Sequence, residues 1–199
     1  MREFAADPPV ERRAGEALRA ADATVAVAES CTGGLIGSLL TDVPGSSAYF
    51  DRSLVTYAYD AKRDELAVPR EALDAHGAVS EPVAKSMAAG IRDTADATFG
   101  LATTGIAGPG GATDDDPVGT VHGAVAYAAP WGTEASFVRP WHRVFDGDRL
   151  AVKERAARFA LERLLAVVEE VSDDDGDGAP GDDGDAESEP NPRSESDPG

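Results

Sequence analysis

Apolar and polar positions follow two alternating patterns along the chain. Short runs rich in β-branched and aromatic residues predict strands, at 24–28, 54–59, 98–104, 121–128 and 134–145. Stretches with apolar residues at helical spacing lie between and around these runs and predict helices, at 10–21, 33–41, 60–66, from 80 onward and at 148–171. Strands that alternate with helices predict an α/β fold, a three-layer domain with a mostly parallel sheet flanked by helices.

Two of the helix starts are marked by local residues. Asp60 is a predicted N-cap, because its short side chain can accept a hydrogen bond from an amide two or three residues further on. Ser80-Glu81-Pro82 predicts another start. Val83, Met87 and Ile91 then follow along one face of that helix, which predicts that this face is buried.

Composition changes abruptly after Val171. Residues 172–199 hold eleven acidic residues, one basic residue, four prolines and no large apolar side chain. Such a segment has no apolar side chains whose burial could offset the loss of conformational entropy on folding. We therefore predict a folded domain over 1–171 and a disordered acidic tail over 172–199. The tail accounts for −10 of the net charge of −19, which leaves −9 on the folded part.

The acidic body contains only three lysines, Lys62, Lys85 and Lys153. Acidic, lysine-poor compositions are typical of salt-adapted cytoplasmic proteins, and they offer no basic stripe for nucleic acid or an anionic membrane. No apolar run approaches the ~18 residues of a membrane span, and no signal-peptide core precedes the first helix. The single cysteine excludes an internal disulfide and a Cys-rich metal site. We therefore expect a cytoplasmic protein without metal or cofactor.

The clearest candidate for a catalytic or binding segment is Glu29-Ser30-Cys31-Thr32-Gly33-Gly34, a turn between a predicted strand and a predicted helix. A serine at such a turn faces the crevice where open α/β sheets bind ligands. The first amides of the helix and the paired glycines would offer donors to a phosphate or an oxyanion. The alternative is an N-cap with glycines for tight packing, and the residues alone leave both interpretations open.

A serine hydroxyl needs a base to become a nucleophile. His76 lies in a predicted polar segment between helices and His122 and His142 lie in predicted strands, so a Ser-His-Asp triad cannot be assembled. A lysine with a lowered pKa is an alternative base. Lys62 follows the strand predicted to lie beside Ser30, although an ordinary solvated helix residue would fit the same position.

Another glycine-rich element, Thr103–Gly111, follows a further predicted strand. It is neither a Walker loop nor a dinucleotide fingerprint, because no Lys-Ser/Thr follows and Pro109 interrupts it. Together with the segments around Ser30 and Lys62, it indicates one composite site at a single edge of the sheet.

Seven blocks of residues, in order along the chain, closely resemble the CinA C-terminal-domain family: Ala28–Gly34, Thr41–Phe50, Val55–Tyr57 with Lys62, Gly77–Glu81, Thr104–Gly111, Pro117–Thr120 and Phe145–Arg149. The resemblance implies an amidase that hydrolyses nicotinamide mononucleotide to nicotinate mononucleotide and ammonia, in pyridine-nucleotide recycling. A small nucleotide substrate is the implied partner, and self-association as a homo-oligomer is left open.

The resemblance also implies roles for single residues. Ser30 would be the nucleophile, Lys62 its general base, and Tyr57 a hydroxyl that tunes or relays the proton. Substrate would be bound by Thr32, Gly33, Gly34, Ser46, Thr104 and Gly105. Cys31 is a rival nucleophile, but adjacent side chains on such a turn point apart, so only one of the two faces the crevice. Two alternatives stay open: a nucleotide-binding regulatory module without turnover, and an amidase for another carboxamide.

Overall fold

The computed structural model describes residues 3–176. Its elements, in chain order, are α1 (Val10–Ala20), β1 (Val25–Glu29), α2 (Leu35–Thr41), the short 3-10 helix η1 (Ser46–Ala48), β2 (Phe50–Val55), α3 (Tyr59–Leu66), α4 (Arg70–His76), α5 (Glu81–Ala95), β3 (Phe99–Gly105), β4 (Thr120–Tyr127), β5 (Phe137–Val144) and α6 (Arg149–Gly176). No helix within this range combines the length and the hydropathy needed to cross a membrane.

The strands form one five-stranded sheet in the order β2-β1-β3-β4-β5. β1 runs parallel to both of its neighbours, β2 and β3, whereas β3–β4 and β4–β5 pair antiparallel. The α/β class is confirmed, but only half of the sheet is parallel. The reason lies in the connections: no helix intervenes after β3, so β4 and β5 return beside their predecessors as antiparallel strands.

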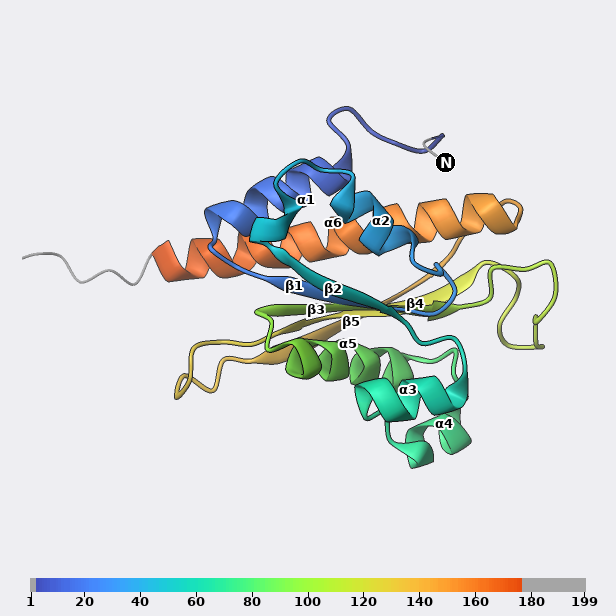
Figure 1. Cartoon of the computed structure of the whole chain (residues 1–199). Helices are drawn as coiled ribbons and strands as arrows, with labels where there is room; N and C mark the ends of the chain where they lie inside the picture. Colours follow the sequence, from blue (N-terminus) through green and yellow to red (C-terminus); the bar gives the residue numbers. More distant parts are fainter. Residues whose placement is uncertain (1–2, 177–199) are drawn as a thin grey trace, which may run out of the picture.

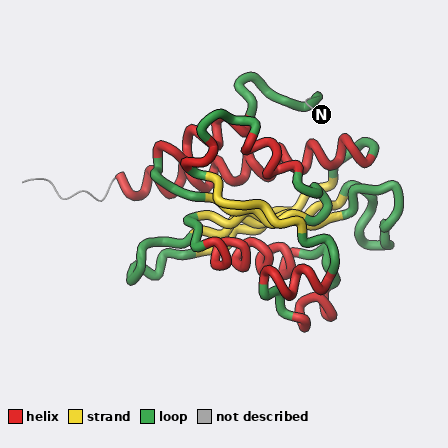
Figure 2. Tube along the Cα trace, viewed as in Figure 1, coloured by secondary structure: helices red, strands yellow, loops and turns green. Residues whose placement is uncertain are grey.

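Helices cover both faces of the sheet, which confirms the three layers (Figure 2). α1, α2 and α6 lie on one face, and α3, α4 and α5 lie on the other (Figure 1). β1 contributes to both cores because its side chains alternate: Val25 and Val27 belong to the cluster under α6, and Ala26 and Ala28 to the cluster on α5. The central strand is therefore buried on both sides, and its carboxyl end is fixed between two packed layers.

The helix predicted from Ser80 forms as α5. Ser80 occupies its N-cap position, and Val83, Met87 and Ile91 are fully buried. α6 runs to Gly176, past Val171, and the predicted division into a domain over 1–171 and a tail over 172–199 stays a prediction. The rest of the predicted tail, 177–199, lies outside the described residues.

Three local predictions are wrong. The strand predicted at 54–59 ends at Val55, because Tyr57 and Tyr59 are exposed and α3 already begins at Tyr59. The N-cap of α3 is Ala58, so Asp60 lies in the first turn of the helix. His76 ends α4, a short helix where the sequence predicted a polar segment between helices.

Candidate active site

The candidate site lies where the parallel strands β1 and β2 end. Ser30 follows β1 directly and donates its amide to Thr103 O of β3 at 3.0 Å, while Thr56 follows β2 and donates its amide to Glu29 O at 2.9 Å. Because parallel strands end at the same edge, these bonds hold the two connecting segments side by side. The Ser30 side chain is nearly buried, at 8% exposed.

Lys62 lies in α3, and its fully buried side chain extends to this edge. Its Nζ lies 3.1 Å from Ser30 Oγ, 2.7 Å from Thr56 O and 3.3 Å from Tyr57 O. Burial lowers the pKa of Lys62 from 10.5 to about 8, since a desolvated ammonium is less stable than the neutral amine. The neutral form is therefore accessible near physiological pH.

The three contacts of Lys62 Nζ fit both protonation states: the ammonium can donate to all three atoms, and the neutral amine also has a complete arrangement. A neutral amine carries two N–H donors and one lone pair, and two of the neighbouring atoms are carbonyl oxygens that only accept. When the two N–H groups donate to Thr56 O and Tyr57 O, the lone pair is left for the third neighbour, the Ser30 hydroxyl. The Ser30 O–H then donates to Nζ, which is the arrangement of a nucleophile with its base.

Cys31 faces away from this chemistry. Its side chain is 5% exposed and packs with Ala107, Val121 and Phe145. Burial raises the pKa of its thiol to about 12, so the reactive thiolate does not form near neutral pH. The placement of Cys31 agrees with a packing role beside Ser30.

The first turn of α2 is occupied by a protein carboxylate. Glu29 is fully buried, and its two oxygens accept from Gly34 N at 2.9 Å, Ile36 N at 3.1 Å and Gly37 N at 2.9 Å. Ser53 of β2 donates a fourth hydrogen bond at 2.8 Å. The expectation that these helix amides receive a substrate anion is therefore wrong, because Glu29 already fills that position.

The paired glycines permit the turn that brings Glu29 back onto α2. Gly33 has φ +62° and Gly34 has φ +92°, in the left-handed region that other residues rarely adopt. Sequence reasoning assigned no role to Glu29. The signal that could have found it is an acidic residue at the strand end, a few residues before a helix that has no serine, threonine or aspartate at its N-cap.

The two threonines predicted to bind substrate use their hydroxyls within the protein. Thr32 Oγ1 lies 2.8 Å from Thr103 Oγ1, and Thr104 Oγ1 donates to Ala78 O at 2.7 Å. Gly105 lies at the end of β3, where a Cβ would come within 2.4 Å of Thr120 O. These residues lie near the Ser30 edge, where the two hydroxyls are hydrogen-bonded within the protein, and their role in substrate binding stays a prediction.

Tyr57 and Ser46, the two other predicted site residues, do not point to the Ser30–Lys62 pair. The Tyr57 side chain is 62% exposed, and its hydroxyl lies 3.4 Å from Arg149 Nη2 rather than beside Ser30 or Lys62. Ser46 lies in η1, before β2 begins, whereas Ser30 follows the end of β1. Since the two strands are parallel, Ser46 lies at the opposite edge of the sheet within this chain.

The structure adds two cations that the sequence did not single out. Arg149, at the start of α6, donates to Gly108 O at 2.6 Å. Lys153, one turn further along, has its Nζ only 3.3 Å from the point where a Cβ on Gly33 would lie. Arg149 closes one of the recognised sequence blocks, and Lys153 is one of three lysines in the chain, so each carried a weak signal.

The histidines stay apart from the nucleophile. His122 and His142 stack across β4 and β5 with ring centroids 4.5 Å apart, and burial lowers the pKa of His122. Among residues 3–176, none of the histidines is hydrogen-bonded to Ser30, and no group of three or more His, Cys, Asp or Glu side chains could hold a metal ion. Lys62 is thus the titratable group that contacts Ser30.

A cavity of about 350 Å³ lies at the other end of the sheet, beside the start of β3, and its lining includes Ala20, Thr98 and Val171. It contains no carboxylate, amine or imidazole among its lining side chains. We place the candidate site at Ser30 and Lys62 because the reactive groups meet there.

Comparisons with known proteins identify the family of this chain. Residues 7–168 match the model of the CinA C-terminal domain. The nicotinamide-nucleotide amidohydrolase PncC of Shigella flexneri is 44% identical over 78% of this chain and 90% of that protein. A CinA-like protein of Desulfosudis oleivorans is 57% identical over 65% of this chain, and the match covers 31% of that longer protein.

Solved structures show the same fold. The competence/damage-inducible protein CihA of Agrobacterium tumefaciens superposes with a TM-score of 0.73 at 42% identity, over 79% of this chain and 92% of that one. A CinA superfamily protein of Klebsiella pneumoniae gives a TM-score of 0.74 at 35% identity, over 81% of this chain and 96% of that one. On the family match and these relatives, the chain belongs to the CinA C-terminal domain family.

Proposed function

We propose that this chain is an amide hydrolase that deamidates nicotinamide mononucleotide to nicotinate mononucleotide and ammonia, with Ser30 as nucleophile and Lys62 as general base. The observation that carries the proposal is the fully buried Lys62 amine 3.1 Å from the Ser30 hydroxyl. The substrate follows from the name of the Shigella flexneri relative, of which the match covers 90%.

The first half of the reaction forms an ester on Ser30. The neutral Lys62 amine takes the hydroxyl proton while Ser30 Oγ attacks the carboxamide carbon and gives a tetrahedral oxyanion. The protonated Lys62 then gives this proton to the leaving nitrogen. The C–N bond breaks, ammonia departs, and Lys62 is neutral again.

The second half repeats these steps with water. Lys62 takes a proton from a water molecule, whose oxygen attacks the acyl carbon of the ester. The bond to Ser30 Oγ breaks, and Lys62 returns the proton to Ser30. One amide and one water thus yield one carboxylic acid and one ammonia.

The oxyanion needs donors other than the first turn of α2. Glu29 occupies the amides of Gly34, Ile36 and Gly37. The backbone of 31–33, directly after the nucleophile, is the nearest remaining segment, and we assign the oxyanion donors to it. Gly33, Gly34 and Gly105 then serve substrate as backbone surface without side chains.

A purely binding module is the less favourable alternative. A buried lysine costs free energy through desolvation, and a module that only held a nucleotide would gain nothing from such a lysine aimed at a serine. An amidase for another carboxamide keeps the same chemistry with a different substrate, and the assay below separates the two.

The test is ammonia release by the purified protein from nicotinamide mononucleotide and from a panel of other carboxamides. We expect turnover of the nucleotide by the wild type and by Lys85→Ala, which removes an exposed lysine of α5. Ser30→Ala and Lys62→Ala should release none above background. If the enzyme hydrolyses only another carboxamide, the proposed substrate is wrong. If Ser30→Ala still turns over, Ser30 is not the nucleophile.

A further inference from the structure

Lys153 is a half-buried cation at the edge of the site, and no residue of 3–176 pairs with it. It lies in the first turns of α6, and its Nζ lies over the glycine turn that follows Ser30, 3.3 Å from the position of a Cβ on Gly33. Within residues 3–176, it forms no ion pair and no hydrogen bond. In a chain of net charge −19, an unpaired lysine at this place calls for a physical reason.

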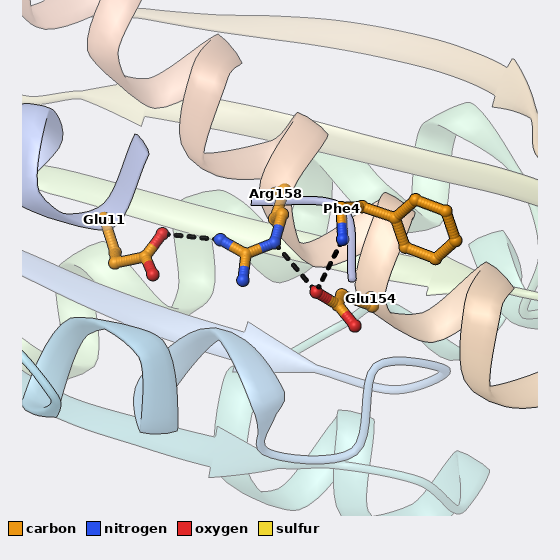
Figure 3. Close-up of polar contacts among 4 residues, drawn as sticks. All are labelled: Phe4, Glu11, Glu154 and Arg158. Carbon is orange, nitrogen blue, oxygen red and sulfur yellow. Dashed lines mark hydrogen bonds and ion pairs between the residues drawn. The ribbon is translucent and has the colours of Figure 1, made fainter. Parts of the chain in front are cut away.

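Three acidic residues of this region, Glu154, Asp148 and Glu29, are hydrogen-bonded to other groups. Glu154, the neighbour of Lys153, accepts hydrogen bonds from Arg158 Nε at 3.1 Å and from the backbone amide of Phe4 at 3.3 Å (Figure 3). Arg158 also donates a hydrogen bond to the Glu11 carboxylate. Asp148 accepts from the first amides of α6. Glu29 is bonded to α2 and Ser53. None of these carboxylates neutralises Lys153.

A second cation lies on the same side of α6. Arg149 precedes Lys153 by four residues, so the two occupy adjacent positions on one helix face, where like charges repel by about 0.2–0.5 kcal/mol. The Arg149 guanidinium is held in place by Gly108 O and the Tyr57 hydroxyl. Two neighbouring cations that form no ion pair with a carboxylate of residues 3–176 are a suitable setting for an anionic ligand.

We propose that Lys153 is the residue that selects a phosphate monoester on the substrate, with Arg149 as its neighbouring cation. The proposal rests on the proposed function, because the reacting amide is placed at Ser30. Gly33 follows Ser30 by three residues and lies beside Lys153 Nζ, so we expect a ligand bound at both residues to cross the side-chain-free surface of this glycine. The compact ammonium of a lysine suits the phosphate as a point charge.

The kinetic test compares nicotinamide mononucleotide with its phosphate-free riboside, at one fixed ionic strength because salt screens exposed charges. Lys153→Gln should raise KM for the nucleotide by about tenfold or more, in line with loss of one charge-assisted hydrogen bond, with kcat nearly unchanged. Its kcat/KM for the riboside should match that of the wild type. Lys153→Arg should retain most of the affinity, and Lys85→Gln is the matched control for loss of one positive charge.

An equal loss on both substrates would overturn the proposal, because Lys153 would then support the glycine turn and not the phosphate. Melting curves show whether each variant is folded. A Lys153→Gln enzyme with unchanged KM for the nucleotide would overturn it as well.

A binding test separates this proposal from the proposed function. Ser30→Ala, which lacks the nucleophile, should bind the nucleotide more tightly than the riboside by calorimetry, and the preference should vanish in the Ser30→Ala/Lys153→Gln double variant. If the preference is present but the wild type releases no ammonia, the phosphate subsite stands and the amidase assignment fails. If both ligands bind equally, the subsite fails whatever the enzyme hydrolyses.

Discussion

The amine of Lys62 and the hydroxyl of Ser30 lie 3.1 Å apart although 32 residues separate them in the chain. Ser30 follows β1, and Lys62 stands in the helix that follows β2. The two meet because these neighbouring strands are parallel and end at the same edge. The reactive pair is thus a product of the sheet topology.

The strongest prediction concerns that pair. Ser30→Ala and Lys62→Ala should each lower kcat by on the order of 10³-fold or more, because either change removes the nucleophile or its base. The double variant should be little worse than either single variant, since the two residues act as one unit. Ammonia release under single-turnover and steady-state conditions measures all three.

Lys62→Arg separates a base from a fixed positive charge. Arginine keeps the charge but does not give up its proton at working pH, so this variant should be as inactive as Lys62→Ala. Near wild-type turnover by Lys62→Arg would end the assignment of Lys62 as general base. Binding of substrate to the inactive variants shows that the pocket is intact.

The rate should rise with pH through the titration of Lys62. Only the neutral amine can accept the Ser30 proton, and burial lowers the pKa of Lys62 to about 8. We therefore expect kcat/KM to increase along one ionisation near pH 8 and then to level off. A rate that is flat from pH 6 to pH 10 would contradict a lysine base.

The same titration affects stability. The folded-state pKa of Lys62 is lowered from 10.5 to about 8, so between these values the unfolded chain binds the extra proton. The free energy of unfolding should therefore rise with pH from about 8 to 10.5 through this group, by on the order of 3 kcal/mol. Below pH 8, both states are protonated and the full penalty applies. Chemical denaturation of the wild type and of Lys62→Met, compared across this range, isolates the effect.

The parts of the site that follow from sequence are those set by strand order. A serine after one predicted strand and a lysine after the next come to the same end of the sheet when the two strands are neighbours and parallel, which the alternation of strands and helices predicts. The pairing of these two residues as nucleophile and base came from the resemblance to the family. The capping by Glu29 was missed, because a carboxylate that turns back onto its own helix depends on the left-handed conformations of Gly33 and Gly34. Sequence pattern does not show where a side chain points.

The same limit explains the other differences. The aromatic residues Tyr57 and Tyr59 looked like strand residues, but β2 begins and ends several positions earlier. Ser46 lies within a recognised sequence block, yet it is at the opposite end of β2 from the reactive pair. Lys153 is 123 positions after Ser30, and only the packing of α6 over α2 brings it to the turn.

Glu29 provides a prediction about positioning. Glu29→Gln should destabilise the protein by about 2 kcal/mol or more, because an amide group replaces one acceptor oxygen by a donor facing backbone N–H groups. It should also lower kcat, since the Ser30 turn loses its anchor, while KM changes little. Ser53→Ala removes one of the four hydrogen bonds and should cost about 1 kcal/mol. Denaturation and steady-state kinetics measure both variants, and full activity of a folded Glu29→Gln would show that the anchor is dispensable.

Tyr57→Phe tests whether the tyrosine hydroxyl takes part in proton transfer. That hydroxyl is exposed and lies 3.4 Å from Arg149, while the contribution of Tyr57 to Lys62 is its backbone carbonyl, which phenylalanine retains. We therefore expect kcat and its pH profile to stay within about twofold of wild type, and KM to rise a few-fold as Arg149 loses a partner. A proton relay through the hydroxyl would instead lower kcat by about 100-fold or more and alter the pH profile. A change in KM alone would thus show that the Tyr57 hydroxyl supports Arg149, and a large fall in kcat would show that it takes part in proton transfer.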